Sequence, residues 1–289
     1  MSGRWASVWH QSNQLAAPQG RFESATFCGR VCPFPQAADT AVLPSVTFFG
    51  SQIAALRRSL RALYWYSRTR VDIARIDEGA STTRQRLVLA TVSLIGTAIF
   101  VVLIAALHFV SDIDPIQRPT SEYAVGPTGY LMTLAFVAIS ASTWALVIGL
   151  GQGLLEPGRS RLGLGFLGVF GIGVLVAAAF PIDLEGAPQT LHGTIHSING
   201  PLTFLSLVVG TNLVSRRLKH DERWQPIHRF ALVLALIMIP EFIAGGLAAA
   251  RETGAGIAQR VLVITFATWF LVMAMQLRKT ATQPAAARV

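Results

Sequence analysis

The chain has 289 residues, of which 52% are hydrophobic and only 13% are charged. Soluble domains carry about a quarter charged residues, so this composition excludes an ordinary soluble protein. The formal net charge of +9 would suit a nucleic-acid-binding protein. However, the Arg residues lie in the terminal segments and certain loops of an apolar chain, where they act as orientation signals. We therefore expect the lipid bilayer as the main partner, and no nucleic acid.

Residues 1–84 are expected to form a cytoplasmic extension that is largely disordered. Residues 1–50 contain Pro, Ser and Gln without a sustained hydrophobic period, which is typical of disorder. A basic amphipathic helix over 53–68 would suit a membrane surface, although a short helix without such a role fits the pattern equally well. The only cysteines, Cys28 and Cys32, have the spacing of neither a zinc knuckle nor a redox pair.

Six apolar runs of about twenty residues follow, the length that a helix needs to cross a bilayer. Backbone amides in hydrocarbon must be satisfied within their own segment, so each run is predicted to be helical. The predicted spans are Leu87–Val110, Pro127–Gly151, Leu162–Phe180, Leu191–Val214, Ile227–Ala249 and Gly256–Leu277. The third is rich in glycine, which lets backbones approach closely and favours a central place in the bundle. The sequence thus predicts an all-α integral membrane protein, with a six-helix domain over 85–280 and a tail over 281–289.

Basic residues favour one set of loops. They precede the first span and follow the second, fourth and sixth, as Arg84, Arg86, Arg159, Arg161, Arg216, Arg217, Lys219, Arg223, Arg278 and Lys279. The alternate loops hold Asp112, Asp114, Glu122, Asp183, Glu185 and the neighbours Arg251 and Glu252. By the positive-inside rule, both termini are cytoplasmic. The excess of Arg over Lys is typical of a GC-rich bacterial genome, so we expect a bacterial inner membrane.

A polar stripe runs along the fourth span, where His192, His196, Asn199, Thr203 and Ser206 recur on one side of a helix. Such a stripe should face protein or water rather than lipid. The i, i+4 spacing of the two histidines also suits two ligands of one metal ion, so a zinc site is left open. In the other interpretation, both histidines bond to backbone or carboxylate groups. The further ligands considered are His108, Asp112, Asp114, Asp183 and Glu241. No other cofactor is predicted.

Glu241 is the only carboxylate inside a predicted span. An ionised carboxylate there costs about 2.5–3.5 kcal/mol on insertion scales, so we expect it to be protonated or paired with Arg260, His196 or His108. As a functional residue it would carry protons, bind a cation or act as a catalytic acid or base. As a structural residue it would join the fifth and sixth spans, and the sequence does not choose between these roles.

The outer loops offer further polar groups. Asp114 would bind a cation or pair with Arg118, and Ser121 and Glu122 would satisfy free amides in the first turn of a helix. Arg260 lies near the last outer loop, where it would suit an anionic head group.

Four motifs resemble the prokaryotic membrane family called domain of unknown function 998. They are PTSEYAVGPTGYL after the first span, FPID at the end of the third, GTIHSINGPLTF at the start of the fourth and QRVLVITFATW in the last. The resemblance covers residues 85–280 in order and implies a six-helix membrane protein without an established activity. It marks Ser121, Glu122, Tyr123, Asp183, His196 and Arg260 as candidate site residues without assigning them roles.

A weaker similarity concerns membrane hydrolases of the alkaline ceramidase and progestin-receptor type. These proteins use a Ser, an Asp and three His around zinc, and two of the His have the spacing of His192 and His196. His108, Ser121, Asp114 and Asp183 are the available complements. The chain departs from these proteins because it has six spans rather than seven and carries the histidine pair on the fourth.

Three functions therefore compete. The first is a non-enzymatic membrane protein that handles ions or small molecules at an outward-facing polar site. The second is a metal-dependent hydrolase of a lipid, with His108, His192 and His196 as ligands. The third is a structural or regulatory partner of another membrane protein. The candidate polar site comprises Asp114, Ser121, Glu122, Tyr123, Asp183, Asn199, Glu241 and Arg260. Without a P-loop, a Rossmann glycine pattern or a G-x-S-x-G elbow, ATP-driven transport, dinucleotide chemistry and α/β-hydrolase chemistry are not expected.

Overall fold

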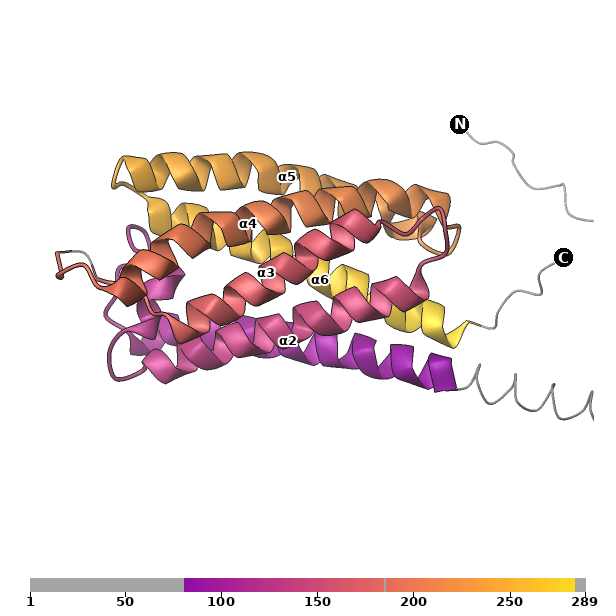
Figure 1. Ribbon diagram of the computed structural model, residues 1–289, viewed down its shortest axis with the longest axis horizontal. Coiled ribbons are helices and arrows are strands. Elements are labelled where there is room, and N and C mark those ends of the chain that lie inside the picture. Colours follow the sequence, from indigo (N-terminus) through magenta and orange to yellow (C-terminus); the bar gives the residue numbers. More distant parts are fainter. Residues whose placement is uncertain (1–80, 185, 284–289) are drawn as a thin grey trace, which may run out of the picture. The chain divides into compact units, whose positions relative to one another are not determined.

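A computed structural model describes residues 81–184 and 186–283, and in this part of the chain it contains helices and loops but no strand. The predictions for residues 1–80, including the surface helix over 53–68, lie outside the described residues. Six helices are long and apolar enough to cross a membrane. They are a first span over Ser81–Val110, α2 (Gly129–Gly153), α3 (Arg161–Ala179), α4 (Leu191–Arg217), α5 (Gln225–Ala250) and α6 (Ala255–Thr282), as Figure 1 shows. The short 3-10 helices η1 (Thr120–Ala124) and η2 (Leu218–His220) lie in two of the connections.

The predicted six-span, all-α architecture is confirmed. Each predicted boundary lies within two helical turns of the observed one. The first span begins at Ser81 rather than at Leu87, and the last span ends at Thr282 rather than at Leu277. Residues 81–84, which the sequence assigned to the extension, already belong to the first span. The sequence prediction missed these turns because polar and charged residues occupy the helix ends, so an apolar run ends before the helix does.

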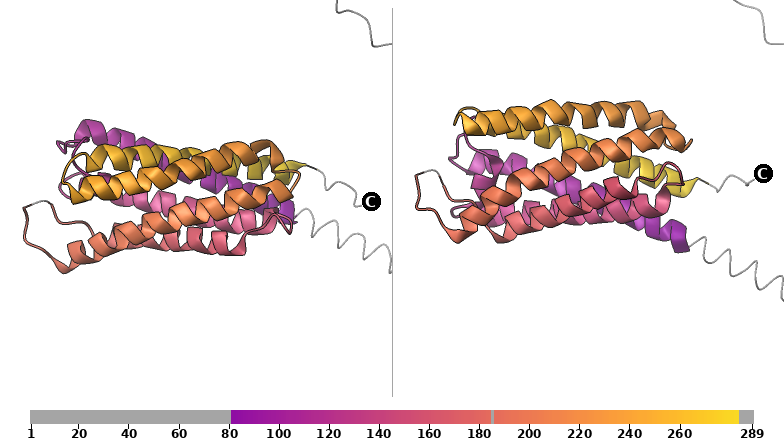
Figure 2. Two further views of the ribbon diagram at one scale, coloured as in Figure 1. Left: turned by 90° about the horizontal axis from the view of Figure 1, so that it is seen from above. Right: turned by 45° about the horizontal axis from the view of Figure 1, so that its top comes forward.

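The helices pack in chain order. Each helix from α2 to α6 contacts the next one, and α6 also contacts α2. The first span lies against α2, where the Ser142 hydroxyl bonds to the Ser93 carbonyl at 2.8 Å, and against α6, where the rings of Phe100 and Phe266 are 5.7 Å apart. Figures 1 and 2 place α5 at the edge of the bundle, beside α4 and α6.

Helix α3 packs between α2 and α4 through its glycines. A Cβ added at Gly171 would crowd Trp144 of α2, and one added at Gly173 would overlap the Thr203 side chain of α4. The predicted close approach of this helix is therefore confirmed. Its predicted central position is not, because α6 is the most buried of the six spans and α5 is the least buried.

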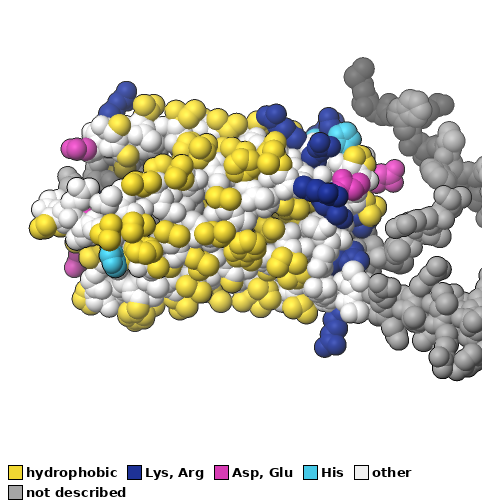
Figure 3. Space-filling view, viewed as in Figure 1, with side chains coloured by type: hydrophobic (Ala, Val, Ile, Leu, Met, Phe, Trp, Pro, Cys, Tyr) yellow, Lys and Arg dark blue, Asp and Glu magenta, His cyan; other side chains and the backbone are white. Residues whose placement is uncertain are grey.

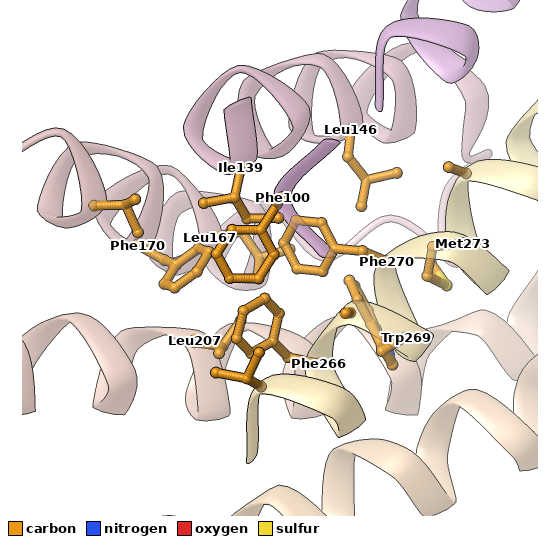
Figure 4. Packing of buried hydrophobic residues seen from close by; sticks show 14 of the residues in the cluster. Phe100, Ile139, Leu146, Leu167, Phe170, Leu207, Phe266, Trp269, Phe270 and Met273 are labelled. Carbon is orange, nitrogen blue, oxygen red and sulfur yellow. The ribbon is translucent and has the colours of Figure 1, made fainter. Parts of the chain in front are cut away.

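Aromatic and branched side chains fill the centre of the bundle. The Phe266 ring meets those of Phe170 and Phe270 edge-on, with centroids 5.8 and 5.9 Å apart. Leu167 and Leu207 pack against the same cluster from α3 and α4 (Figure 4). Such close packing stabilises a membrane bundle because lipid supplies little hydrophobic driving force between helices.

The two ends of the bundle differ in charge. Lys and Arg side chains gather where the first span begins, where α6 ends, and in the α2–α3 and α4–α5 loops, and we call this the basic end (Figure 3). Hydrophobic side chains cover the middle of the face shown in Figure 3. We call the opposite end, which carries η1 and the α3–α4 and α5–α6 loops, the η1 end.

Candidate functional site

The candidate residues of the sequence lie in several separate places near the η1 end. One of these is a buried network around Arg260 of α6. Its Nε–H donates to Nε2 of His108 at 2.7 Å, and its Nη groups donate to the Tyr123 hydroxyl and the Arg118 carbonyl, both at 2.8 Å. His108 also bonds through Nδ1 to the Ile104 carbonyl at 2.6 Å. Both ring nitrogens and most guanidinium donors are thus occupied by the protein, so Arg260 joins α6, η1 and the first span.

Glu122 and Asp114 flank this network without sharing a pocket with it. The Glu122 carboxylate is buried and lies 3.7 Å from the Arg118 guanidinium. Burial raises the pKa of Glu122, and the Arg118 charge offsets part of that rise. Asp114 is solvent-exposed and accepts a hydrogen bond from the Ile116 amide at 2.8 Å, as a turn residue does.

Asp183 fixes the start of α4. Its two carboxylate oxygens accept hydrogen bonds from the Thr190 amide at 2.8 Å and the Thr190 hydroxyl at 2.7 Å. The amide bond, followed by the hydroxyl bond, lowers the pKa of Asp183. Thr190 in turn caps α4 by accepting from the Gly193 amide, and a Cβ at Gly193 would overlap the Asp183 carboxylate. The FPID motif therefore has a structural role here.

The polar stripe of α4 faces protein, as predicted, except at its first residue. Asn199 donates to the Gly173 carbonyl of α3 at 2.8 Å and accepts from the Thr203 hydroxyl at 3.2 Å. Ser206 is buried and bonds within its own helix. His192 is exposed and lies edge-on to the Phe180 ring.

A cavity of about 370 Å³ lies between α4, α5 and α6, next to η1, and we call it the α4–α5 cavity. Its polar lining residues are Ser121, His196, Ser197, Glu241 and Gln259. The rest of the lining is mainly apolar or glycine and includes Phe204, Phe242, Gly245, Gly246 and Leu262. A second cavity of about 60 Å³ extends between α2, α3, α4 and α6, and Ser121, His196 and Gln259 are among the residues that line both cavities.

Two residues at the junction of the cavities have their hydrogen-bonding atoms fixed by neighbours. His196 is buried, and its Nδ1 lies 2.8 Å from the Phe180 carbonyl, so Nδ1 carries a proton and, in the neutral ring, Nε2 is an acceptor. The side-chain oxygen of Gln259 accepts from the Thr120 amide at 2.7 Å and from its hydroxyl at 3.1 Å. These two bonds use only the oxygen of Gln259, so the N–H donors of its side-chain amide take no part in them.

Glu241 lines the α4–α5 cavity from α5. Its Oε1 accepts a hydrogen bond from the Thr265 hydroxyl of α6 at 2.7 Å. Its Oε2 is buried and finds no hydrogen-bond partner among the described residues. The predicted partners Arg260, His196 and His108 are wrong, because the protein partner of this carboxylate is a neutral hydroxyl. A buried, unpartnered oxygen costs about 1–3 kcal/mol in stability.

The three predicted metal ligands are not brought together. His108 bonds to Arg260, His196 bonds to Phe180 in the interior, and His192 lies at the surface beside Asp183. Residues 81–184 and 186–283 contain no group of three His, Cys, Asp or Glu side chains that could hold a metal ion. The i, i+4 spacing puts His192 and His196 on one side of α4. Nevertheless, Nδ1 of His196 bonds to a backbone carbonyl in the interior, whereas the His192 ring is exposed at the surface.

Sequence reasoning missed several residues that line the cavity. Gln259 precedes Arg260 in the last motif, and polar residues near helix ends give no distinctive signal. Pro201 has no N–H, so the carbonyl of Ser197, four residues earlier, lacks the donor that this position usually supplies in a helix. The pair Gly245 and Gly246 opens the α5 wall, since a Cβ at either position would meet nothing within 4 Å.

The family model for a protein of unknown function, DUF998, matches residues 94–276. Because the match covers more than half of the chain, the chain belongs to this family. Comparisons with curated proteins and with solved structures found no match.

Proposed function

We propose that this DUF998 member is a membrane protein that binds a small, largely apolar molecule in the α4–α5 cavity. The observation that carries the proposal is the cavity itself, about 370 Å³ in volume, with apolar walls and a few polar groups. Cavities that bind small molecules usually measure about 300–1,000 Å³ and have this kind of lining. Binding requires no covalent chemistry, which agrees with the first of the three functions that the sequence left open.

The position of α5 supports entry of this molecule from the bilayer. Helix α5 is the least buried span, and Ile243 and Leu247 beside the cavity expose about half of their surface. In a membrane these side chains face acyl chains. Gly245 and Gly246 have no side chains to close the part of the cavity wall that α5 forms. An apolar molecule in the lipid therefore meets little obstruction there.

The proposal also places the cavity in the outer half of a bacterial cytoplasmic membrane, with both termini in the cytoplasm. Its support is the concentration of Lys and Arg at the basic end (Figure 3), which the positive-inside rule assigns to the cytoplasm. The cavity lies near the η1 end, beside Pro119 and Ala255.

Photolabelling with a neutral probe tests the proposal. The probe is a linear alkanol of about nine carbons with a diazirine at its far end, applied to the protein in phosphatidylcholine nanodiscs. Peptides from α4, α5 and α6 should be labelled, and unlabelled nonan-1-ol should saturate this labelling, which distinguishes a site from general partition into lipid.

A cavity-filling variant supplies the control. Gly245→Phe places a ring in the cavity and should abolish the saturable labelling. Gly165→Phe is the matched control, because Gly165 is exposed on α3, also has open space around its Cβ position and does not line the cavity. Labelling that does not saturate, or that is equal in both variants, would refute the proposal.

A further inference from the structure

We infer that the α4–α5 cavity selects hydrophobic amines, in which an ammonium group pairs with Glu241 and an apolar body fills the rest of the space. This inference rests on the proposed function and goes beyond it by naming the chemical class of the ligand. We base it on which polar atoms of the lining residues already have hydrogen-bond partners in the protein and which do not.

The first remaining atom is an acidic acceptor. Glu241 lines the cavity, its Oε1 is bound by Thr265, and its Oε2 has no partner among the described residues. The described part of the chain contains no ion pair to this carboxylate. A carboxylate inside a span requires a cation or a proton, and an ammonium group supplies both charge and donors.

Two residues of the same wall, His196 and Ser197, each carry a neutral acceptor. Nδ1 of His196 is held by the Phe180 carbonyl, which leaves Nε2 as an acceptor in a residue that lines the cavity. The Ser197 carbonyl lacks its usual donor four residues later, because Pro201 has no N–H. An ammonium group has three N–H donors and no acceptor, so this set of groups complements it.

The lining disfavours an anion of the same size. Its donors are neutral, namely the Gln259 amide and the hydroxyls of Ser121 and Ser197. No Lys or Arg is among the described residues that line the cavity. The nearby Arg260 is occupied by His108 and by the η1 region. A carboxylate ligand would therefore lie near Glu241 without a compensating charge, and like charges in a low dielectric repel strongly.

Three probes of equal length test the selection. Nonylamine, nonan-1-ol and nonanoate compete for the diazirine alkanol label in phosphatidylcholine nanodiscs at pH 7. With the wild-type protein, half-maximal competition by the amine should need about tenfold less probe than competition by the alcohol, as expected for one charge-assisted hydrogen bond. Nonanoate should compete least.

Two matched variants then assign the preference to one carboxylate. Glu241→Gln keeps the size of the side chain and should remove the preference for the amine while retaining competition by the alcohol, which also shows that the variant is folded. Glu252→Gln removes a carboxylate from the exposed α5–α6 loop at the same end and should keep the preference.

The outcomes separate this inference from the proposed function. Equal competition by amine and alcohol in the wild type, a preference that survives in Glu241→Gln, or stronger competition by nonanoate would each overturn the amine inference and leave the cavity as a site for neutral or anionic molecules. Labelling that nonan-1-ol does not saturate would instead refute the proposed function.

Discussion

Arg260 and His108 form a cation–imidazole hydrogen bond of 2.7 Å in which the imidazole must be the acceptor. The guanidinium has only donors, and the other ring nitrogen of His108 bonds to a carbonyl, which has only lone pairs. The ring is therefore neutral, with its proton on Nδ1. A protonated ring would present an N–H to the Arg260 N–H and break the contact.

This relationship predicts that Arg260 stabilises the fold. Arg260→Ala would leave His108 Nε2 and the Tyr123 hydroxyl without their donor, and we expect a loss of about 3 kcal/mol in the free energy of unfolding. Arg260→Lys should lose much of the same stability, because an ammonium group lacks the planar fork that reaches both groups at once. Thermal unfolding in detergent measures the loss.

The control is Arg251→Ala, which removes an exposed Arg from the α5–α6 loop and should change stability little. If Arg260→Ala unfolded no more readily than Arg251→Ala, the network would not stabilise the protein.

A second prediction concerns Asp221 at the basic end. Its side chain is buried, accepts from the Leu155 amide at 3.0 Å and forms an ion pair with Arg223 at 2.8 Å. Arg223 also donates to the Gly153 carbonyl at 2.7 Å, so the pair joins the α4–α5 and α2–α3 connections. Asp221→Asn should cost about 3 kcal/mol, the lower end of the range for breaking a buried pair, because Arg223 is partly exposed.

Glu222→Gln is the matched control for Asp221→Asn, because it changes an exposed carboxylate at the next residue. Urea unfolding of the two variants in one detergent gives the comparison. Equal stability of both would mean that the ion pair contributes nothing beyond a surface charge.

The sequence predicted the fold because each span had to satisfy its backbone within lipid, and that constraint acts on every run of apolar residues independently. The candidate site was harder to predict. His196 and Glu241 were singled out as ionisable groups inside spans, and they do line one cavity. Asp183, from an outer loop, and His108, from the first span, were singled out as possible metal ligands, yet they bind Thr190 and Arg260 instead.

The difference between these residues depends on tertiary contacts that a linear pattern does not contain. Nothing in the spacing of the α4 stripe indicates that Nδ1 of His196 meets a carbonyl sixteen residues earlier. Nor does it indicate that Thr265, rather than a basic residue, reaches Glu241. Rotamers and crossing positions decide these pairs, and packing sets them only once the helices associate.

Glu122 predicts a pH dependence of stability. Burial raises its pKa above the ordinary value of 4.5 despite the Arg118 charge. The folded state therefore holds a proton that the unfolded state releases more readily, so stability should fall as the pH rises from 4.5 through the folded pKa. Glu122→Gln removes this proton uptake, so between pH 4 and pH 7 its melting temperature should fall less, or rise more, than that of the wild type.

The comparison for this experiment is Glu252→Gln, an exposed carboxylate at the same end of the bundle. Its melting temperature should follow the wild-type dependence on pH. A larger fall, or a smaller rise, of the melting temperature from pH 4 to pH 7 in Glu122→Gln than in the wild type would contradict the predicted sign.

The proposed orientation predicts opposite accessibility for two loops. In a background with Cys28→Ser and Cys32→Ser, single cysteines are placed by Lys219→Cys in the α4–α5 connection and Thr253→Cys in the α5–α6 connection, both at exposed positions. A membrane-impermeant maleimide applied to intact bacterial cells should label Thr253→Cys, and Lys219→Cys should react only after permeabilisation, because the positive-inside rule keeps the Lys- and Arg-rich loops in the cytoplasm. The reverse pattern would place the α4–α5 cavity in the inner leaflet, so that any ligand would enter it from the cytoplasmic side.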